Sequence, residues 1–209
     1  MFSQEEIKKN HSNSWENIWT IYNSTQKFYK GPMFITTTVL NIAIYIIVFL
    51  LNTNLFQLIS KTTDLYLSVL PNLLGFNLGA YALLIGLASS NILIKLTKGI
   101  DNSFTFFQKA SSVFAISIVL QGFTLLIAFI IKQVIMIQEI ANFYYDKAFE
   151  YLIIGINFCV FVCLNFFGIY SLLMILMLVK NIFGLSQTAN FLGGVENIDN
   201  EKQKAKKLD

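Results

Sequence analysis

The chain has 209 residues, of which 55% are hydrophobic and 13% charged, and its formal net charge is +3 at pH 7. Soluble domains carry about 25% charged residues, so this composition predicts an integral membrane protein and leaves no room for a separate soluble catalytic domain. All 15 basic residues are lysine, and because arginine is the usual bidentate ligand of phosphate and guanine, direct nucleic-acid binding is disfavoured.

A polar leader, residues 1–32, comes before the first apolar run. Its apolar face recurs at helical spacing and consists of Trp15, Ile18, Trp19 and Tyr22. Asn13 and Glu16 resemble a capping box, so the pattern predicts an amphipathic helix over about 13–28. Two interpretations stay open: the helix lies in the headgroup layer as a membrane-surface anchor, or it docks on the protein's own cytosolic face.

Four apolar runs, each long enough to cross a bilayer, make up a transmembrane domain over residues 33–180. We expect spans at about 33–56, 65–92, 111–137 and 151–179, with a short connector over Gln57–Asp64. Residues 181–209 form a lysine-rich tail that leaves the last span through Gly184 and Gly193-Gly194 and is expected to be mobile. The predicted fold class is therefore all-α: an integral membrane four-helix bundle with an N-terminal amphipathic helix.

The lysines are distributed unevenly between the two sides of such a bundle. The leader, the 95–109 connector and the C-terminal segment counted from Lys180 hold twelve of the fifteen lysines, and these three segments share one side. The positive-inside rule then predicts that both termini are cytoplasmic. The first 33 residues contain no apolar signal-peptide core, so we expect the first span to remain as an uncleaved anchor.

The second span carries a stripe of small and polar residues on one helical face. Its members alternate in steps of four and three, and they are Ser68, Asn72, Gly75, Gly79, Ala82, Gly86 and Ser89. Apolar side chains gain little by leaving lipid, so helices in membranes associate through close backbone approach and hydrogen bonds. The stripe therefore predicts a packing interface, either with another span of the same chain or with the same helix of a second copy.

The spans also contain uncharged amides, and those outside the stripe are Asn41, Asn77, Gln121, Asn157 and Asn165. One interpretation is hydrogen bonding between helices of the bundle. The other is a polar lining of a water-filled pore formed by several copies.

The chain offers little for catalysis or metal binding. No Asp or Glu falls inside a predicted span, and His11 lies in the leader. Cys159 and Cys163 share one face of the fourth span, where helix packing is the expected role. We find no activated nucleophile, metal cage or phosphate loop, so the chain is expected to be non-enzymatic, without a cofactor or a metal.

The chain combines four spans, both termini inside, a tryptophan-containing leader, a lysine-rich tail and a second span that opens with Leu70–Phe76 (LPNLLGF). It resembles the small four-span accessory proteins encoded beside RNA-targeting type VI-B CRISPR effectors and, more broadly, compact membrane effectors of bacterial antiviral systems. The resemblance implies a protein that modulates a cytosolic defence nuclease or damages the membrane during infection.

We therefore expect a self-associating inner-membrane protein that acts in antiviral defence, with the lipid bilayer, further copies of itself and a cytosolic protein as partners. The alternatives are a small channel or transporter component for a neutral solute, and an assembly factor for another membrane complex.

Overall fold

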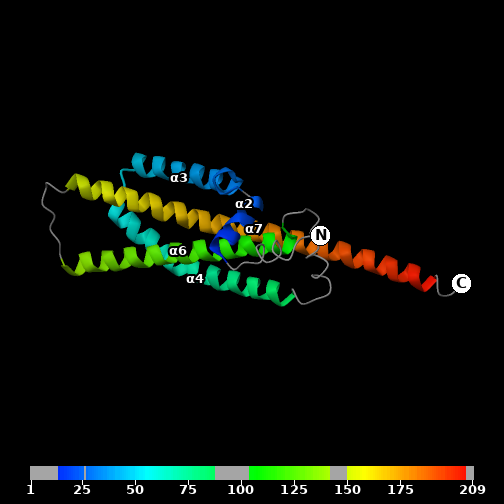
Figure 1. Cartoon of the computed structure of the whole chain (residues 1–209). Helices are drawn as coiled ribbons and strands as arrows, with labels where there is room; N and C mark the ends of the chain where they lie inside the picture. The colour runs from blue at the N-terminus through cyan, green and yellow to red at the C-terminus, as the bar shows by residue number, and fades with distance from the viewer. Residues whose placement is uncertain (1–13, 26, 88–103, 142–149, 206–209) are drawn as a thin grey trace. The chain divides into compact units, whose positions relative to one another are not determined.

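The computed structural model describes residues 14–25, 27–87, 104–141 and 150–205 (Figure 1). Its elements in chain order are α2 (Trp15–Thr25), the 3₁₀ helix η1 (Phe28–Lys30), α3 (Pro32–Leu50), α4 (Leu55–Leu87), α6 (Phe106–Ala141) and α7 (Glu150–Ala205). No strand occurs in these ranges, so the predicted all-α class is confirmed.

Within the described ranges, four segments are long and apolar enough to cross a membrane, and they are Trp15–Leu50, Leu55–Gly86, Phe107–Gln138 and Tyr151–Gly184. The chain therefore has the character of a multi-pass membrane protein.

The first two spans are joined by a tighter connection than we expected. α3 opens with Pro32, whose missing N–H is not needed in a first turn, and it ends at Leu50. Asn52 then takes a positive φ of 46°, a conformation that asparagine tolerates, and this reverses the chain. The Asn54 side chain accepts hydrogen bonds from the N–H groups of Phe56 (3.0 Å) and Gln57 (3.3 Å) and so caps α4. The segment Gln57–Asp64, expected as a connector, consequently forms the first turns of α4.

The C-terminal segment also differs from the expectation of a mobile tail. α7 continues without interruption to Ala205, so Gly184, Gly193 and Gly194 lie inside a helix. A glycine ends a helix when it adopts a positive φ, and no described glycine does so. Each internal glycine costs roughly 1 kcal/mol of helix propensity, which weakens a helix without ending it.

The chain divides into two compact units. The first combines Met1–Gln26, Gly79–Ile116 and Leu176–Asp209, and the second combines Lys27–Leu78 and Ser117–Ile175. The second unit contains α3 together with parts of α4, α6 and α7, and we call it the bundle unit. We call the other the α2 unit, because α2 is the described helix that lies wholly within it, whereas α4, α6 and α7 are divided between the two units.

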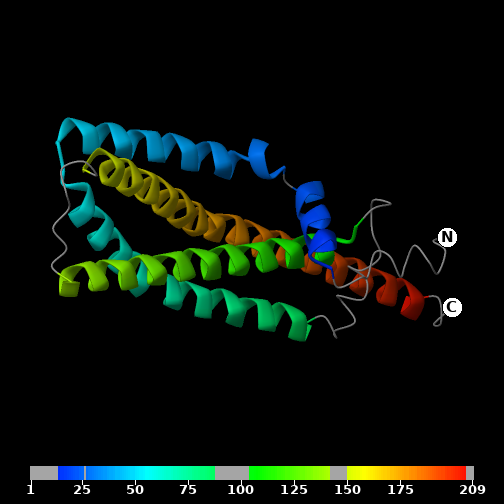
Figure 2. The ribbon, with the colours of Figure 1, turned by 60° about the vertical axis from the view of Figure 1, so that its left-hand side comes forward.

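The bundle unit confirms the predicted four-helix bundle. Within it α3 and α7 run side by side in both views (Figures 1 and 2). One buried cluster joins Tyr66 and Leu70 of α4 with Ala128 of α6 and Leu164 of α7. A second cluster is formed by Ile59, Ile135 and Phe161, with Ile44, Tyr45 and Val48 of α3 packed against it. Side chains from all four helices therefore share this core.

Candidate functional site

The stripe on α4 is exposed along its described length. Its six described members, Ser68, Asn72, Gly75, Gly79, Ala82 and Gly86, are all exposed, and Ser89 lies outside the described residues. A Cβ atom added to Gly75, Gly79 or Gly86 would meet no atom within 4 Å. No described atom therefore fills the space that a side chain would take at these three glycines, and close packing of another span against them is not observed in the described residues.

The polar members of the stripe bond to their own helix. The Ser68 hydroxyl donates to the Leu65 carbonyl (2.8 Å), and the Asn72 amide donates to the Ser68 carbonyl (3.3 Å). Pro71, between them, has no N–H to offer the Leu67 carbonyl. On this exposed face the backbone is accessible at the glycines. The Ser68 hydroxyl and the Asn72 amide can each still form further hydrogen bonds.

The deepest polar contacts of the bundle unit join α4, α6 and α7. The Asn77 amide donates to the Gln121 side-chain carbonyl (2.8 Å), and the Gln121 amide donates to the backbone carbonyl of Ser171 (3.4 Å). All three residues are at most 1% exposed. On the next turn of α6, the Thr124 hydroxyl lies 3.4 Å from the Phe167 carbonyl of α7 and 2.8 Å from the Leu120 carbonyl of its own helix. We call these residues of α4, α6 and α7 the polar seam. It also includes the buried residues that adjoin them on the same helices: Thr63, Ser117, Asn165 and Gly168.

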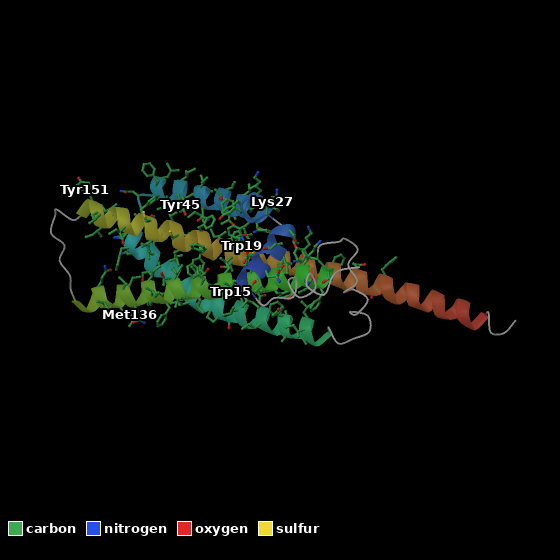
Figure 3. All side chains as sticks on the ribbon, in the orientation of Figure 1. Trp15, Trp19, Lys27, Tyr45, Met136 and Tyr151 are labelled. Atoms are coloured by element: carbon green, nitrogen blue, oxygen red, sulfur yellow. The ribbon has the colours of Figure 1, made fainter. Side chains whose placement is uncertain are left out.

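Two tyrosines extend these contacts toward the other end of the bundle. The Tyr66 hydroxyl of α4 donates to the Asn165 side chain of α7 (3.3 Å). The Tyr45 hydroxyl of α3 lies 2.9 Å from the Asn41 side-chain oxygen and 3.1 Å from the Val162 carbonyl of α7. Figure 3 labels Tyr45 on α3. Each tyrosine thus ties its helix to α7.

The amides singled out from the sequence have different surroundings in the bundle unit. Asn41, Asn77, Gln121 and Asn165 are buried and hydrogen-bonded as described above. Asn157 is half-buried. Bonds between helices involve Asn77, Gln121 and the Asn165 side-chain oxygen, whereas the Asn41 side chain bonds only within α3. A lining shared by several copies stays a prediction.

Several residues of the polar seam were not among those expected from the sequence. They are Ser117, Thr124, Gly168 and Ser171, all of which are buried. A usable signal was present in α6, where Ser117, Gln121, Thr124 and Ala128 recur at steps of four, three and four. This small and polar stripe is the one that packs inside the chain, whereas the glycine-rich stripe of α4 does not.

α2 combines features of both interpretations of the leader. It begins at Trp15, and the Ser14 hydroxyl accepts a hydrogen bond from the Asn17 N–H (3.2 Å). Asn13, the cap expected from the sequence, lies outside the described residues. Ile21 and Tyr22 are buried, whereas Trp15 is 69% and Trp19 39% exposed (Figure 3). One side of the helix is therefore docked on protein while the indoles remain available to a membrane surface.

The docked side of α2 borders a cavity of about 150 Å³ in the α2 unit. Its wall is formed by Ile18, Ile21, Tyr81, Phe107, Gln108, Ser111, Ser112 and Ala115. Its polar side chains already have partners in the chain: Tyr81 bonds to Ser111 (2.9 Å), Gln108 accepts from the Thr105 N–H (2.9 Å) and Ser112 donates to the Lys109 carbonyl (2.8 Å). The cavity is consequently apolar in character.

Charged and sulfur-containing side chains lie at the periphery. Lys132 of α6 forms a 2.8 Å ion pair with Asp64 of α4, and both side chains are partly exposed. Cys159 and Cys163 are free and exposed on α7, so the expectation that they pack against another helix is wrong for the described chain. Among the residues that the structure describes, no three His, Cys, Asp or Glu side chains come together as a metal site.

The comparisons with known proteins give no relative from which a role could be transferred. No protein-family model, no curated protein and no solved structure matches this chain. The exposed stripe of α4 and the polar seam of the bundle are therefore the two features on which a function can be argued.

Proposed function

We propose that this chain is a non-enzymatic multi-pass protein of a bacterial inner membrane, with both termini cytoplasmic, and that it self-associates through the stripe of α4. Its role would be that of an effector or regulator in antiviral defence. The observation that carries the proposal is the stripe itself: six small or polar residues on one face, all exposed. The orientation is supported by the twelve lysines on the side of the termini.

Lipid provides the physical reason for self-association. A face of glycine, alanine and serine offers lipid chains few contacts, but it lets a second backbone approach closely and gain dispersion contacts. Asn72 adds an amide that can bond across such an interface. Alternating steps of four and three follow a 3.5-residue period, so two copies of α4 would cross in a left-handed sense at about 20°.

The polar seam suggests how such an assembly would respond to a signal. Hydrogen bonds between membrane helices contribute only about 0.6 kcal/mol each on average, so the contacts among Asn77, Gln121 and Ser171 present a low barrier to helix separation. A cytosolic partner acting on α2 or on the end of α7 would shift the helices and expose these amides to a shared path. The link to a defence nuclease rests on the resemblance of the chain's general plan.

The interface can be tested by disulfide crosslinking in membranes. With Cys159→Ala and Cys163→Ala as background, Ala82→Cys should form crosslinked dimers on oxidation. Leu83→Cys is the matched control, because Leu83 is 72% exposed but lies off the stripe. Equal crosslinking at both positions, or none at Ala82, would contradict the proposed interface.

Membrane potential in expressing bacteria tests the effector role. Depolarisation during phage challenge should be lost in Gly79→Leu, because the added side chain blocks the approach of a second copy. The protomer itself has room for the Cβ atom of the new side chain, since a Cβ at Gly79 meets nothing within 4 Å. Gly155→Leu on α7, where the space is equally open, is the control and should behave like the parent protein. If the membrane potential of cells expressing the parent protein did not change, the effector role would be contradicted, whereas the crosslinking result would still stand.

A further inference from the structure

Three polar atoms in the bundle unit are buried without a hydrogen-bond partner: Thr63 Oγ1, Ser117 Oγ and Asn165 Nδ2. Their residues are 0%, 0% and 6% exposed. Buried polar groups are nearly always bonded, because leaving one unpaired forfeits its full solvation free energy. The neighbouring hydroxyls of Thr124 and Ser171 do bond to backbone carbonyls, so the three exceptions require a specific explanation.

The three atoms belong to the polar seam rather than to scattered positions. Thr63 precedes Tyr66 by three residues and shares its face of α4, and Tyr66 in turn bonds to Asn165. Ser117 precedes Gln121 by four residues on the buried face of α6. The unpaired groups therefore adjoin existing hydrogen bonds, where one more small partner would complete the network.

The chemistry of the unpaired atoms restricts what that partner can be. The amide Nδ2 of Asn165 can only donate, because an amide NH₂ group has no available lone pair, so this atom cannot coordinate a metal cation. The hydroxyls of Thr63 and Ser117 both donate and accept. The nearby Asp64–Lys132 ion pair is neutral as a whole and provides no countercharge for a buried anion. A small neutral molecule that both donates and accepts satisfies all three atoms.

We infer that the polar seam binds water inside a single bundle, at Thr63 and Asn165 on one side of the amide contacts and at Ser117 on the other. Buried waters of this kind typically make about three hydrogen bonds to groups that lack protein partners. This hydration does not depend on self-association, and it makes the bundle interior a wet layer between α4, α6 and α7.

Near-isosteric substitution distinguishes a hydrated seam from a dry one. Thr63→Val removes the hydroxyl and keeps the shape. If water occupies the site, the variant loses a bond and the thermal midpoint of the full-length protein in lipid nanodiscs should fall by about 2–4 °C. If the site is dry, the variant removes an unsatisfied group and the midpoint should rise, which would overturn the inference. Thr124→Val is the matched control, because its hydroxyl has known partners and sets the size of the expected fall.

A second measurement does not depend on stability. Water-edited solid-state NMR of the ¹⁵N-asparagine-labelled protein in bilayers should show magnetisation transfer from water to the Asn165 side-chain amide, assigned by its loss in Asn165→Leu. The Asn77 amide, bonded to Gln121, is the internal reference and should receive less. Transfer to Asn165 that does not exceed that to Asn77 would overturn hydration at this position.

Discussion

The phenol ring of Tyr66 on α4 occupies the space where any side chain at position 168 of α7 would begin. A Cβ atom added to Gly168 would overlap three atoms of that ring. The ring has little freedom to move away, because Tyr66 is 5% exposed, belongs to a core cluster and bonds to Asn165 through its hydroxyl. The absence of a side chain at 168 is therefore what lets α4 and α7 approach at this level.

Substituting Gly168 with alanine should lower the free energy of unfolding by about 1–3 kcal/mol, the usual cost of overpacking a core. Unfolding of the protein in mixed micelles, followed by circular dichroism, measures the change. Gly155→Ala provides the control on the same helix, because a Cβ there meets nothing within 4 Å. Equal effects of the two variants would show that the Tyr66 ring yields freely.

The contact between Asn77 and Gln121 should appear as coupling in a double-mutant cycle. We expect Asn77→Ala and Gln121→Ala to interact by about 0.6 kcal/mol, within the upper limit of about 1.7 kcal/mol found for membrane helices. The same unfolding assay provides all four corners of the cycle. Pairing Gln121→Ala with Asn72→Ala is the control, since Asn72 is exposed and bonds to Ser68 of its own helix. A coupling as large in that control cycle would contradict a specific Asn77–Gln121 contact.

The attachment of α3 should depend on the Tyr45 hydroxyl. α3 buries only Thr37 and Asn41, so the Tyr45 bond to the Val162 carbonyl is one of its few polar contacts with α7. Tyr45→Phe should cost about 1 kcal/mol in unfolding free energy, the usual net value of one hydrogen bond. Tyr151→Phe, at a side chain that is 87% exposed, should cost nothing measurable. A Tyr45→Phe variant as stable as the parent would leave the attachment of α3 to its ring contacts alone.

Docking of α2 should protect the leader from proteolysis. Ile21 is buried and borders the cavity in the α2 unit, so Ile21→Asp should release the helix and speed tryptic cleavage after the exposed Lys27. Cleavage can be followed on inside-out vesicles. Trp15→Ala should leave the rate unchanged, because this indole is 69% exposed and contributes little to docking. Faster cleavage in the tryptophan variant would instead place the main anchor on the indole face.

Predictions from the sequence were most accurate where a single helix decides the outcome. Four spans follow from apolar length alone, and the described residues contain four segments long and apolar enough to cross a membrane. The ends of the helices were harder to predict, because they depend on the backbone conformation of single residues. Asn52 at positive φ shortened the first connection, and the absence of any such residue in the described part of α7 let that helix run on to Ala205.

Which helix face is buried is a property of the whole bundle. The stripes of α4 and α6 look alike in sequence, since both place small and polar residues at steps of three and four. In a soluble protein polarity would separate buried from exposed faces, but in lipid both faces can be apolar, and shape and hydrogen bonding decide between them. α6 turned its stripe inward because Gln121 and Thr124 find a side-chain amide and backbone carbonyls there.

Composition, hydropathy and lysine placement were thus enough to establish the helical class, to count the spans and to predict their orientation, because each depends on the partition of single segments between water and lipid. The partners of Asn41, Asn77, Gln121 and Asn165, the need for glycine at 168 and the outward direction of the α4 stripe emerged only once the helices were packed. Each of these depends on atoms from segments far apart in the chain. The spacing of residues along one helix does not determine which neighbouring helix its face contacts.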